Sequence, residues 1–384
     1  VLSGGAFTRS KEAGSGATQN GQNSFYNIRN YGDMTINSGV TVMQSGAFSS
    51  LLENGWYDGN QNTSEAPARL TINGGVFSGG LNTIKNDDWG EMTINGGSFE
   101  NVSQAAVLNW NVANIHGGTY EITGNAQAVI LNGHINETMD KGILSVKGVE
   151  YTGAPLLAWM SGSGSKDAGT ITVYDAQTLQ AAIDIAADKT VVLGADIVVG
   201  SQGNSATGLT IANKDVTLDF HGFTLENAGL GFALHITGAS ANVVLKDSSA
   251  AQSGGVYGGQ GGDNQAVRMD GGATVRIDGG NYTVGGDANG LGNSCISIAS
   301  DSVVSVYGGT FSCETAYNGK YYVLNVQQTT GAAGEFTVYG GTFVNYDPST
   351  GDDALSGNFV AEGYEVVSSE DGDSNTLYTV QKAE

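Results

Sequence analysis

The stretch LTINGGVFSGG occupies residues 70–80, and near copies of it recur along the chain. The copies are MTINGGSFEN (92–101), ANIHGGTYEI (113–122), VRIDGGNYTV (275–284), VSVYGGTFSC (304–313) and FTVYGGTFVN (336–345). Each copy joins a short alternation of apolar and polar residues to a Gly-Gly pair and an aromatic residue. Strict alternation predicts a β-strand with one buried face. The chain therefore repeats one β-strand unit many times.

The Gly-Gly pair predicts a corner at the end of each strand. Leu70 and Ile72 share the buried face, and Gly74-Gly75 follows them directly. Glycine is the residue that adopts positive φ angles at low cost, so it suits a sharp change of direction. The aromatic residue after the pair, Phe77 in this copy, then begins the next strand and points inward again.

The spacing of the Gly-Gly pairs predicts a solenoid. Pairs at 74–75, 96–97 and 117–118 are separated by 22 and 21 residues, and those at 279–280, 308–309 and 340–341 by 29 and 32. Periods in the twenties with strand patterning are typical of solenoids made of stacked coils. Each aromatic should then lie about 4.8 Å from its equivalent in the next coil. These aromatics are Phe77, Phe99, Tyr120, Tyr282, Phe311 and Phe343.

This pattern resembles the right-handed parallel β-helix, or pectin-lyase-like, superfamily over most of the chain. The resemblance implies an all-β right-handed parallel β-helix. Members of the superfamily include lyases, hydrolases, adhesins and phage spikes, so the fold alone leaves the activity open. The Asn-Thr-Asp, Gly-His-Gly and Arg-Ile-Lys motifs of the family's pectate lyases and polygalacturonases are missing from this sequence. Their absence favours a non-catalytic member, of the surface adhesin or phage structural type.

A helical segment divides the chain into two tandem arrays. In DAQTLQAAIDIAAD (175–188) the apolar residues Leu179, Ala182, Ile183 and Ala186 recur at helical spacing, and Asp175 is a suitable N-cap. The strand patterns after it resemble the first coils of a β-helix below its N-terminal capping helix. We expect C-terminal coils of a first β-helix over 1–172 and a second β-helix over 173–384. The second carries its capping helix at 176–188 and a C-terminal cap at 345–384.

The start of the chain predicts a fragment. Residues 1–8, VLSGGAFT, already resemble the corner pattern, and neither a signal peptide nor a capping helix comes before them. Either further coils lie upstream or another chain covers the first strand edge, and homo-oligomer formation stays open. The ending GGTF…DPS…GY…YTV resembles the last coil and cap of β-helix modules in bacterial surface and phage proteins.

Charge and hydropathy limit the partners. The formal net charge is −23, from 38 acidic and 15 basic residues. Nucleic-acid binding needs clustered cations, which the sequence lacks, and anionic membranes are repelled for the same reason. An apolar run of about 18–20 residues, as a membrane span needs, is also missing. Neutral glycans of cell surfaces or the environment, or protein partners, fit this charge. We expect an extracellular, cell-surface or virion-surface location.

Cys295 and Cys313 do not form a disulfide framework or a metal-binding spacing. Stacked coils could bring them together, so a disulfide and two separate thiols both stay open.

Aromatic residues supply the predicted glycan contacts. Tyr307 and Tyr339 hold the outward position just before a Gly-Gly pair in successive copies, so they should lie side by side on the exterior. Exposed rings in line can hold sugar rings, and the alternative is a cross-strand pair that only stabilises the sheet. Trp56 and Trp89, in loops one coil apart, are the second candidate pair.

Charged residues supply weaker alternatives. VRMDGGATVRID (267–278) places Arg268, Asp270, Arg276 and Asp278 outward, and Asp270, Arg276 and Asp278 would be the first residues to test for a polysaccharide lyase or glycoside hydrolase. Surface ion pairs of this kind are common and weak, and they are the favoured explanation of the pattern.

No cofactor is expected, and calcium is the one ion that the sequence leaves open. Asp87 and Asp88 form an acidic pair in a loop, and Asp263 ends a single copy of the calcium-binding Gly-Gly-x-Gly-x-Asp pattern. We predict a non-enzymatic extracellular module for glycan or protein binding, or a virion scaffold.

Overall fold

The computed structural model describes residues 1–9, 25–58, 66–133, 142–160, 170–186, 189–200, 208–286, 292–299, 301–327, 333–351 and 357–384. These residues form strands and one helix, and their sheets are built mostly from parallel pairs. The chain divides into two compact units, unit 1 (Val1–Val173) and unit 2 (Tyr174–Glu384). The stacked parallel strands are compatible with a parallel β-helix.

Unit 1 is built from coils of three short strands. The strands of four successive coils are β5 (Ala68–Ile72), β6 (Val76–Gly79) and β7 (Asn82–Asn86), then β8 (Gly90–Ile94), β9 (Ser98–Asn101) and β10 (Ala105–Asn109), then β11 (Val112–Ile115), β12 (Thr119–Ile122) and β13 (Ala128–Asn132), then β14 (Ile143–Val146), β15 (Glu150–Thr152) and β16 (Leu157–Trp159). Each strand pairs in parallel with its equivalent in the next coil, such as β5 with β8 and β6 with β9.

The three positions of the coil form three parallel stacks. The first runs β3–β5–β8–β11–β14–β17, with β3 (Asp33–Gln44) and β17 (Thr170–Val173) at its ends. The second runs β3–β6–β9–β12–β15, because the long strand β3 spans two positions. The third runs β2–β4–β7–β10–β13–β16, beginning with β2 (Ile28–Asn30) and β4 (Leu52–Asn54). Strand β1 (Leu2–Arg9) pairs with β3.

Glycine is required at the corner between the first two stacks. Gly75 has a φ of 114°, and a Cβ at this position would lie 2.8 Å from the carbonyl oxygen of Val40 in the preceding coil. Gly309 repeats the arrangement in unit 2, with a φ of 110° and the same 2.8 Å approach to the carbonyl oxygen of Gly280. The predicted corner is confirmed, and it needs glycine both for φ and for space.

Stacked aromatic rings fill the interior behind the corner. Phe77 and Phe99 are parallel to within 7° at 5.0 Å between ring centroids, and Phe99 and Tyr120 to within 10° at 4.9 Å. In unit 2, Tyr282, Phe311 and Phe343 stack at 5.1 and 5.0 Å. All of these rings are buried. The stacking of equivalent aromatics predicted from the repeat is therefore confirmed in both units.

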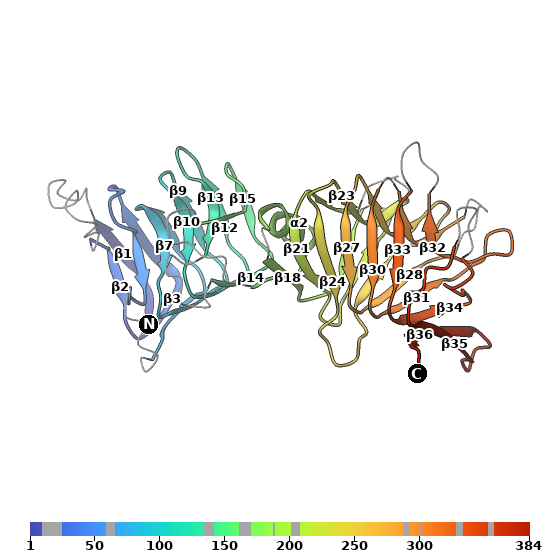
Figure 1. Ribbon diagram of the computed structural model, residues 1–384. Coiled ribbons are helices and arrows are strands. Elements are labelled where there is room, and N and C mark those ends of the chain that lie inside the picture. The colour runs from blue at the N-terminus through green and yellow to red at the C-terminus, as the bar shows by residue number, and fades with distance from the viewer. Residues whose placement is uncertain are drawn as a thin grey trace. The chain divides into compact units, whose positions relative to one another are not determined.

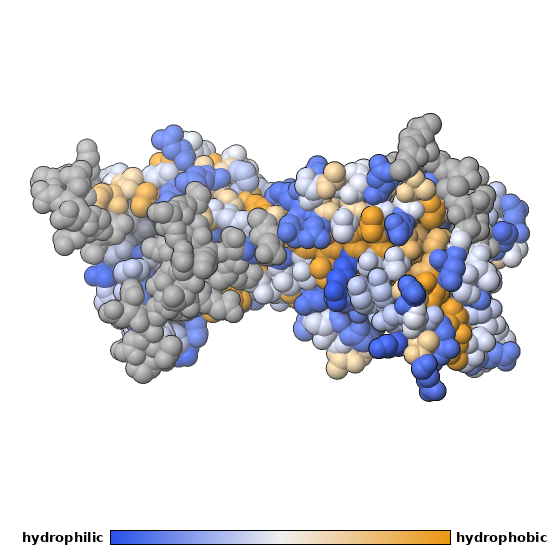
Figure 2. Space-filling view, viewed as in Figure 1, coloured by the Kyte–Doolittle hydropathy of each residue, from blue (hydrophilic) through white to orange (hydrophobic). Residues whose placement is uncertain are grey.

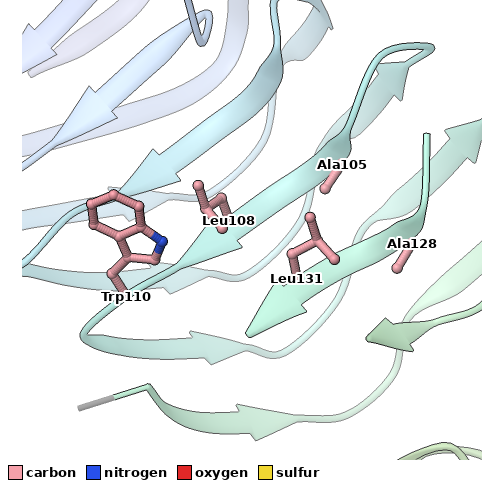
Figure 3. Packing of buried hydrophobic residues seen from close by; sticks show 5 residues of the cluster. All are labelled: Ala105, Leu108, Trp110, Ala128 and Leu131. Atoms are coloured by element: carbon pink, nitrogen blue, oxygen red, sulfur yellow. The ribbon is translucent and has the colours of Figure 1, made fainter. Parts of the chain in front are cut away.

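A second apolar cluster lies on the third stack of unit 1. Leu108 and Leu131 are partners in register on β10 and β13, and Ala105 and Ala128 are partners at the start of the same strands. Figure 3 shows these side chains beside Trp110, which follows β10. Neighbouring side chains of a strand point to opposite faces, so Leu108 and Val107 lie on opposite faces of the sheet. Both are buried, so this sheet is apolar on its two sides.

Unit 2 repeats the coil of three strands. Its successive coils are β18 (Lys189–Leu193), β19 (Ile197–Val199) and β20 (Leu209–Ala212), then β21 (Asp215–Asp219), β22 (Thr224–Asn227) and β23 (Phe232–Thr237), then β24 (Asn242–Lys246), β25 (Gly255–Tyr257) and β26 (Gln265–Asp270), then β27 (Thr274–Ile277), β28 (Asn281–Val284) and β29 (Ser294–Ile298), then β30 (Val303–Val306), β31 (Thr310–Cys313) and β32 (Tyr322–Val326), and finally β33 (Glu335–Val338) and β34 (Gly341–Val344). Figure 1 shows the stack of β24, β27, β30 and β33 as neighbouring arrows.

Helix α2 (Ala176–Ile185) begins unit 2 at the place that its sequence predicts. The Asp175 carboxylate accepts a hydrogen bond of 2.8 Å from the backbone N–H of Thr178, which satisfies one free donor of the first turn. Leu179, Ala182 and Ile183 are buried, and the helix contacts β18, β19 and β20, the three strands of the first coil. It ends at residue 185, whereas the sequence predicted an end at 188; residues 187 and 188 lie outside the described residues.

The end of unit 2 departs from the parallel pattern. Strands β35 (Tyr364–Glu370) and β36 (Thr376–Lys382) form an antiparallel pair, and β36 pairs antiparallel with β34.

The two cysteines, Cys295 and Cys313, are buried and are not joined by a disulfide. The Cys295 thiol donates a hydrogen bond of 3.1 Å to the backbone carbonyl of Tyr282, and burial raises the pKa of Cys295 far above its ordinary range.

Candidate functional site

The clearest surface feature of unit 2 is a column of aromatic rings. Tyr307 follows β30 and Tyr339 follows β33, and the parallel register of these strands brings the two residues together. Their rings are parallel to within 6° at a centroid distance of 4.7 Å, and 44% of Tyr307 is exposed to solvent. The predicted side-by-side arrangement on the exterior is confirmed.

The column continues at both ends. The Arg276 guanidinium lies 4.3 Å from the ring centroid of Tyr307, on the side of β27, and its Nε is 2.6 Å from the Asp278 carboxylate. This hydrogen bond raises the pKa of Arg276. Tyr364 meets Tyr339 edge-on, at 5.5 Å and 84°. Because Tyr307 has Arg276 over one face and Tyr339 over the other, a ligand meets the edge and the hydroxyl of this ring rather than its face.

Asp270 belongs to a different cluster from Arg276. Its carboxylate accepts hydrogen bonds from Thr237 (2.5 Å), His235 (3.0 Å) and Arg268 (3.1 Å). Desolvation raises the pKa of Asp270, but the hydrogen bonds from these three side chains together outweigh it and lower the pKa.

The corner at Gly271 and Gly272 separates Asp270 from the Arg276–Asp278 pair. Both glycines have positive φ, and the chain passes there from the stack of β26 to that of β27. The two Arg-x-Asp copies are therefore two separate ion pairs on two sheets. The structure does not bring Asp270, Arg276 and Asp278 together as one catalytic cluster.

Unit 1 brings its predicted tryptophans together. Trp56 and Trp89 stack at 6.1 Å with an interplanar angle of 24°, and Tyr31 meets Trp56 edge-on at 5.9 Å. Trp89 is only 9% exposed, and its indole N–H donates to the Asp58 carboxylate at 3.2 Å. Trp89 therefore forms the support of the pair, while Trp56 and the exposed ring of Tyr31 face outward.

The acidic residues beside Trp89 contact other groups of the protein and stabilise their own loop. Asp87 and Asp88 are both fully buried. The Lys85 ammonium is 2.5 Å from the Asp87 carboxylate and 4.2 Å from the centroid of the Trp110 ring. Asp88 accepts a hydrogen bond of 2.8 Å from the backbone N–H of Asp58.

The structure gives the calcium candidates no common centre. No set of three or more His, Cys, Asp or Glu side chains in the described ranges is placed to hold a metal ion. Asp263, the remaining candidate, lies in unit 2 at a positive φ of 62° and donates its backbone N–H to the carbonyl of Gly292. Calcium binding stays a prediction.

Asparagine side chains form two ladders in unit 1. On the exterior, Asn95 donates to Asn73 at 3.0 Å and Asn73 donates to Asn37 at 3.1 Å. His116, the next member by sequence, lies 3.3 Å from the Ser145 hydroxyl, and burial lowers the pKa of this histidine.

The second ladder is buried and was missed by sequence reasoning. It links the last residues of five strands of the third stack, each amide donating to the next side-chain oxygen at 2.7 to 2.9 Å. Its members are Asn30, Asn54, Asn86, Asn109 and Asn132. The signal that could have found it is an asparagine at the last position of these five strands of the third stack, although asparagine is also common in turns.

The comparisons with known proteins give no relative for this chain. No family model matches it, and no curated protein or solved structure matches it either. Among the described residues, no helix is long and apolar enough to cross a membrane.

Proposed function

We propose that this chain is a non-catalytic, extracellular binding module that attaches to neutral glycans. Its architecture would be two tandem parallel β-helices of the pectin-lyase-like type, one per unit, with α2 capping the second. The three parallel stacks of each unit and the contact of α2 with the whole first coil support this architecture. An open first coil presents unpaired strand edges, which a helix would protect.

The tyrosine column is the observation that carries the proposed binding role. Arg276, Tyr307 and Tyr339 lie in contact along the neighbouring strands β27, β30 and β33, Tyr364 of β35 contacts Tyr339, and Tyr307 is substantially exposed. Tyrosine and arginine combine a rigid contact surface with hydrogen-bonding groups, and they are enriched where proteins bind partners. Because each ring is held by its neighbours, little side-chain freedom is left to lose on binding.

The charge and polarity of the surface favour an uncharged ligand. The net charge of −23 opposes anionic polysaccharides. Among the residues that Figure 2 draws in colour, hydrophilic and neutral ones predominate, with bands of hydrophobic residues over parts of unit 2. A polar, rigid surface of this kind suits attachment at a cell or virion surface. We propose that the protein is located there.

Size-exclusion chromatography with a panel of neutral and acidic polysaccharides tests this function, with calcium present and absent. We expect the protein to co-elute with at least one neutral polymer while the polymer keeps its chain length. Shortened polymer would establish the alternative, a polysaccharide lyase or glycoside hydrolase. If the protein co-elutes with none of the polymers, glycan binding is contradicted and protein partners are the next candidates.

A double variant tests the column itself. The change Tyr307→Ala with Tyr339→Ala should weaken binding of the retained polymer at least about tenfold, equivalent to about 1.4 kcal/mol. Tyr307→Phe with Tyr339→Phe keeps the stack and separates the hydroxyl contribution from the ring contribution. Val303→Ala, at an exposed position on β30, is the matched control and should leave affinity unchanged. Unchanged affinity in the double alanine variant would remove the column from the proposal.

A further inference from the structure

A shallow pocket lies on the stack of β20, β23, β26, β29 and β32, a different sheet from the one that carries the tyrosine column. It has a volume of about 250 Å³. The residues that line it include Asp263, Gln265, Asn293, Tyr317, Tyr322 and Asn325. We refer to it as the Gln265 pocket. A volume just below the usual range for drug-sized ligands suits a ligand of about one ring.

Gln265 brings an unused hydrogen-bond acceptor to this pocket. The residue is only 6% exposed, and its side-chain Oε1 is buried without a hydrogen-bond partner. Leaving a buried polar atom unpaired costs about 1–3 kcal/mol, so such atoms are rare in native proteins. A ligand that donates a hydroxyl hydrogen to Oε1 would recover this free energy.

The neighbouring amides are already used by the protein. The Asn293 side chain accepts from the backbone N–H of Asn264 at 2.9 Å and donates to the carbonyl of Gly285 at 2.7 Å. Asn264 in turn accepts from the N–H of Gly231 at 2.9 Å. These bonds satisfy Asn293 and Asn264, whereas the buried side-chain oxygen of Gln265 has no such partner.

Two tyrosines form an aromatic wall. The rings of Tyr317 and Tyr322 lie 6.2 Å apart at an angle of 51°. A tight turn holds the first of them, because Tyr317 and Lys320 exchange backbone hydrogen bonds of 2.8 and 3.0 Å. Aromatic faces beside amide and carboxylate groups can contact both the C–H surface and the hydroxyl groups of a sugar ring.

A separate pocket of about 230 Å³ in unit 2 is lined by Tyr321, Tyr346 and Tyr378. The Asp263 carboxylate in the first pocket and Asp347 in the second would repel an acidic sugar.

We propose that the Gln265 pocket binds a neutral saccharide, with Gln265 accepting a ligand hydroxyl and Tyr322 contacting the ring. This inference deepens the proposed function, because it shares its ligand class. It does not depend on the tyrosine column, because the two sites involve different residues on different sheets.

Gln265→Leu is the most informative variant. It removes the unpaired acceptor while keeping a side chain of similar length, so the thermal unfolding temperature should stay the same or rise. Binding of neutral tetrasaccharides of glucose, galactose, mannose or N-acetylglucosamine, followed by isothermal titration calorimetry on the full chain, should weaken at least tenfold. Asn325→Ala provides a second variant at the same wall, and tetragalacturonate provides the anionic comparison.

The column variants separate this proposal from the previous one. Tyr307→Ala with Tyr339→Ala should leave tetrasaccharide binding unchanged if the Gln265 pocket is the site. Tetrasaccharide binding that survives Gln265→Leu and Asn325→Ala, or that is tighter for tetragalacturonate, would overturn the pocket proposal. Polymer that co-elutes while no neutral tetrasaccharide binds would also overturn it, and would leave the proposed function standing.

Discussion

Phe99 offers the sharpest test of how the coils are held together. Its ring is fully buried between Phe77 at 5.0 Å and Tyr120 at 4.9 Å, so Phe99→Ala interrupts the stack at its centre. Truncating a buried phenylalanine costs about 3–5 kcal/mol through lost burial and the cavity left behind. Two stacked aromatic pairs are lost as well, each contributing about 0.5–1.5 kcal/mol. We therefore expect a loss near the top of the cavity range, about 5 kcal/mol.

Two comparison variants make that figure interpretable. Phe99→Leu keeps most of the side-chain volume, so its loss of the free energy of unfolding should be much smaller than that of Phe99→Ala. Glu100→Ala changes the next, exposed residue, whose carboxylate accepts a hydrogen bond of 3.0 Å from the half-buried Ser78, and should cost less than about 0.5 kcal/mol.

Urea unfolding of the full chain measures the loss, and hydrogen exchange locates it. Because coils interact mainly with their neighbours, protection should fall most in β6, β9 and β12. An alanine variant as stable as Glu100→Ala would refute the stacking argument. So would a loss of protection spread evenly over both units.

Two further predictions concern buried polar groups. Asn86→Ala should lower the free energy of unfolding by about 2–3 kcal/mol, because the buried amide oxygen of Asn109 loses its donor at 2.9 Å. Asn95→Ala, at an exposed position, should lower it only slightly. Equal losses of the two variants in urea unfolding would contradict a stabilising role of the buried ladder. Desolvation raises the pKa of Asp247, but hydrogen bonds from Ser249 and the N–H groups of Gly254 and Gly222 outweigh it, so the folded pKa lies below the unfolded value of about 3.9. The stabilisation is therefore complete above about pH 4 and is lost as the pH falls through the folded pKa. Asp247→Asn should flatten this acid-dependent part of the unfolding profile, and an unchanged slope would show that Asp247 does not contribute to it.

The repeating part of the fold could be predicted because its physical causes are local. Alternation of apolar residues, a glycine at a positive φ and an aromatic behind it are all visible in LTINGGVFSGG. Helix α2 could be predicted for the same reason, because its N-cap Asp175 and the helical spacing of Leu179 and Ile183 lie within one short segment.

The sites could be predicted only where equivalent residues align between coils. Tyr307 and Tyr339 hold the same place before a Gly-Gly pair, so their contact followed from the repeat. The grouping of Asp270 with Arg276 came from closeness in sequence, whereas the corner at Gly271 places them on different sheets.

The Gln265 pocket lay beyond such reasoning for a physical reason. Its walls come from Asp263, Asn293, Tyr317 and Tyr322, which lie in coils of unequal length and at different places relative to the strands. Whether the Gln265 oxygen is paired depends on the hydrogen bonds that the surrounding residues make, and the spacing of residues in the sequence does not predict those bonds.

The co-elution of the unaltered chain with intact neutral polysaccharide is the most direct test of the account as a whole. We expect that a neutral polymer elutes with the protein, that its length is unchanged after incubation, and that acidic polymers do not co-elute. A shortened polymer, or a protein that elutes alone from every member of the panel, would contradict it.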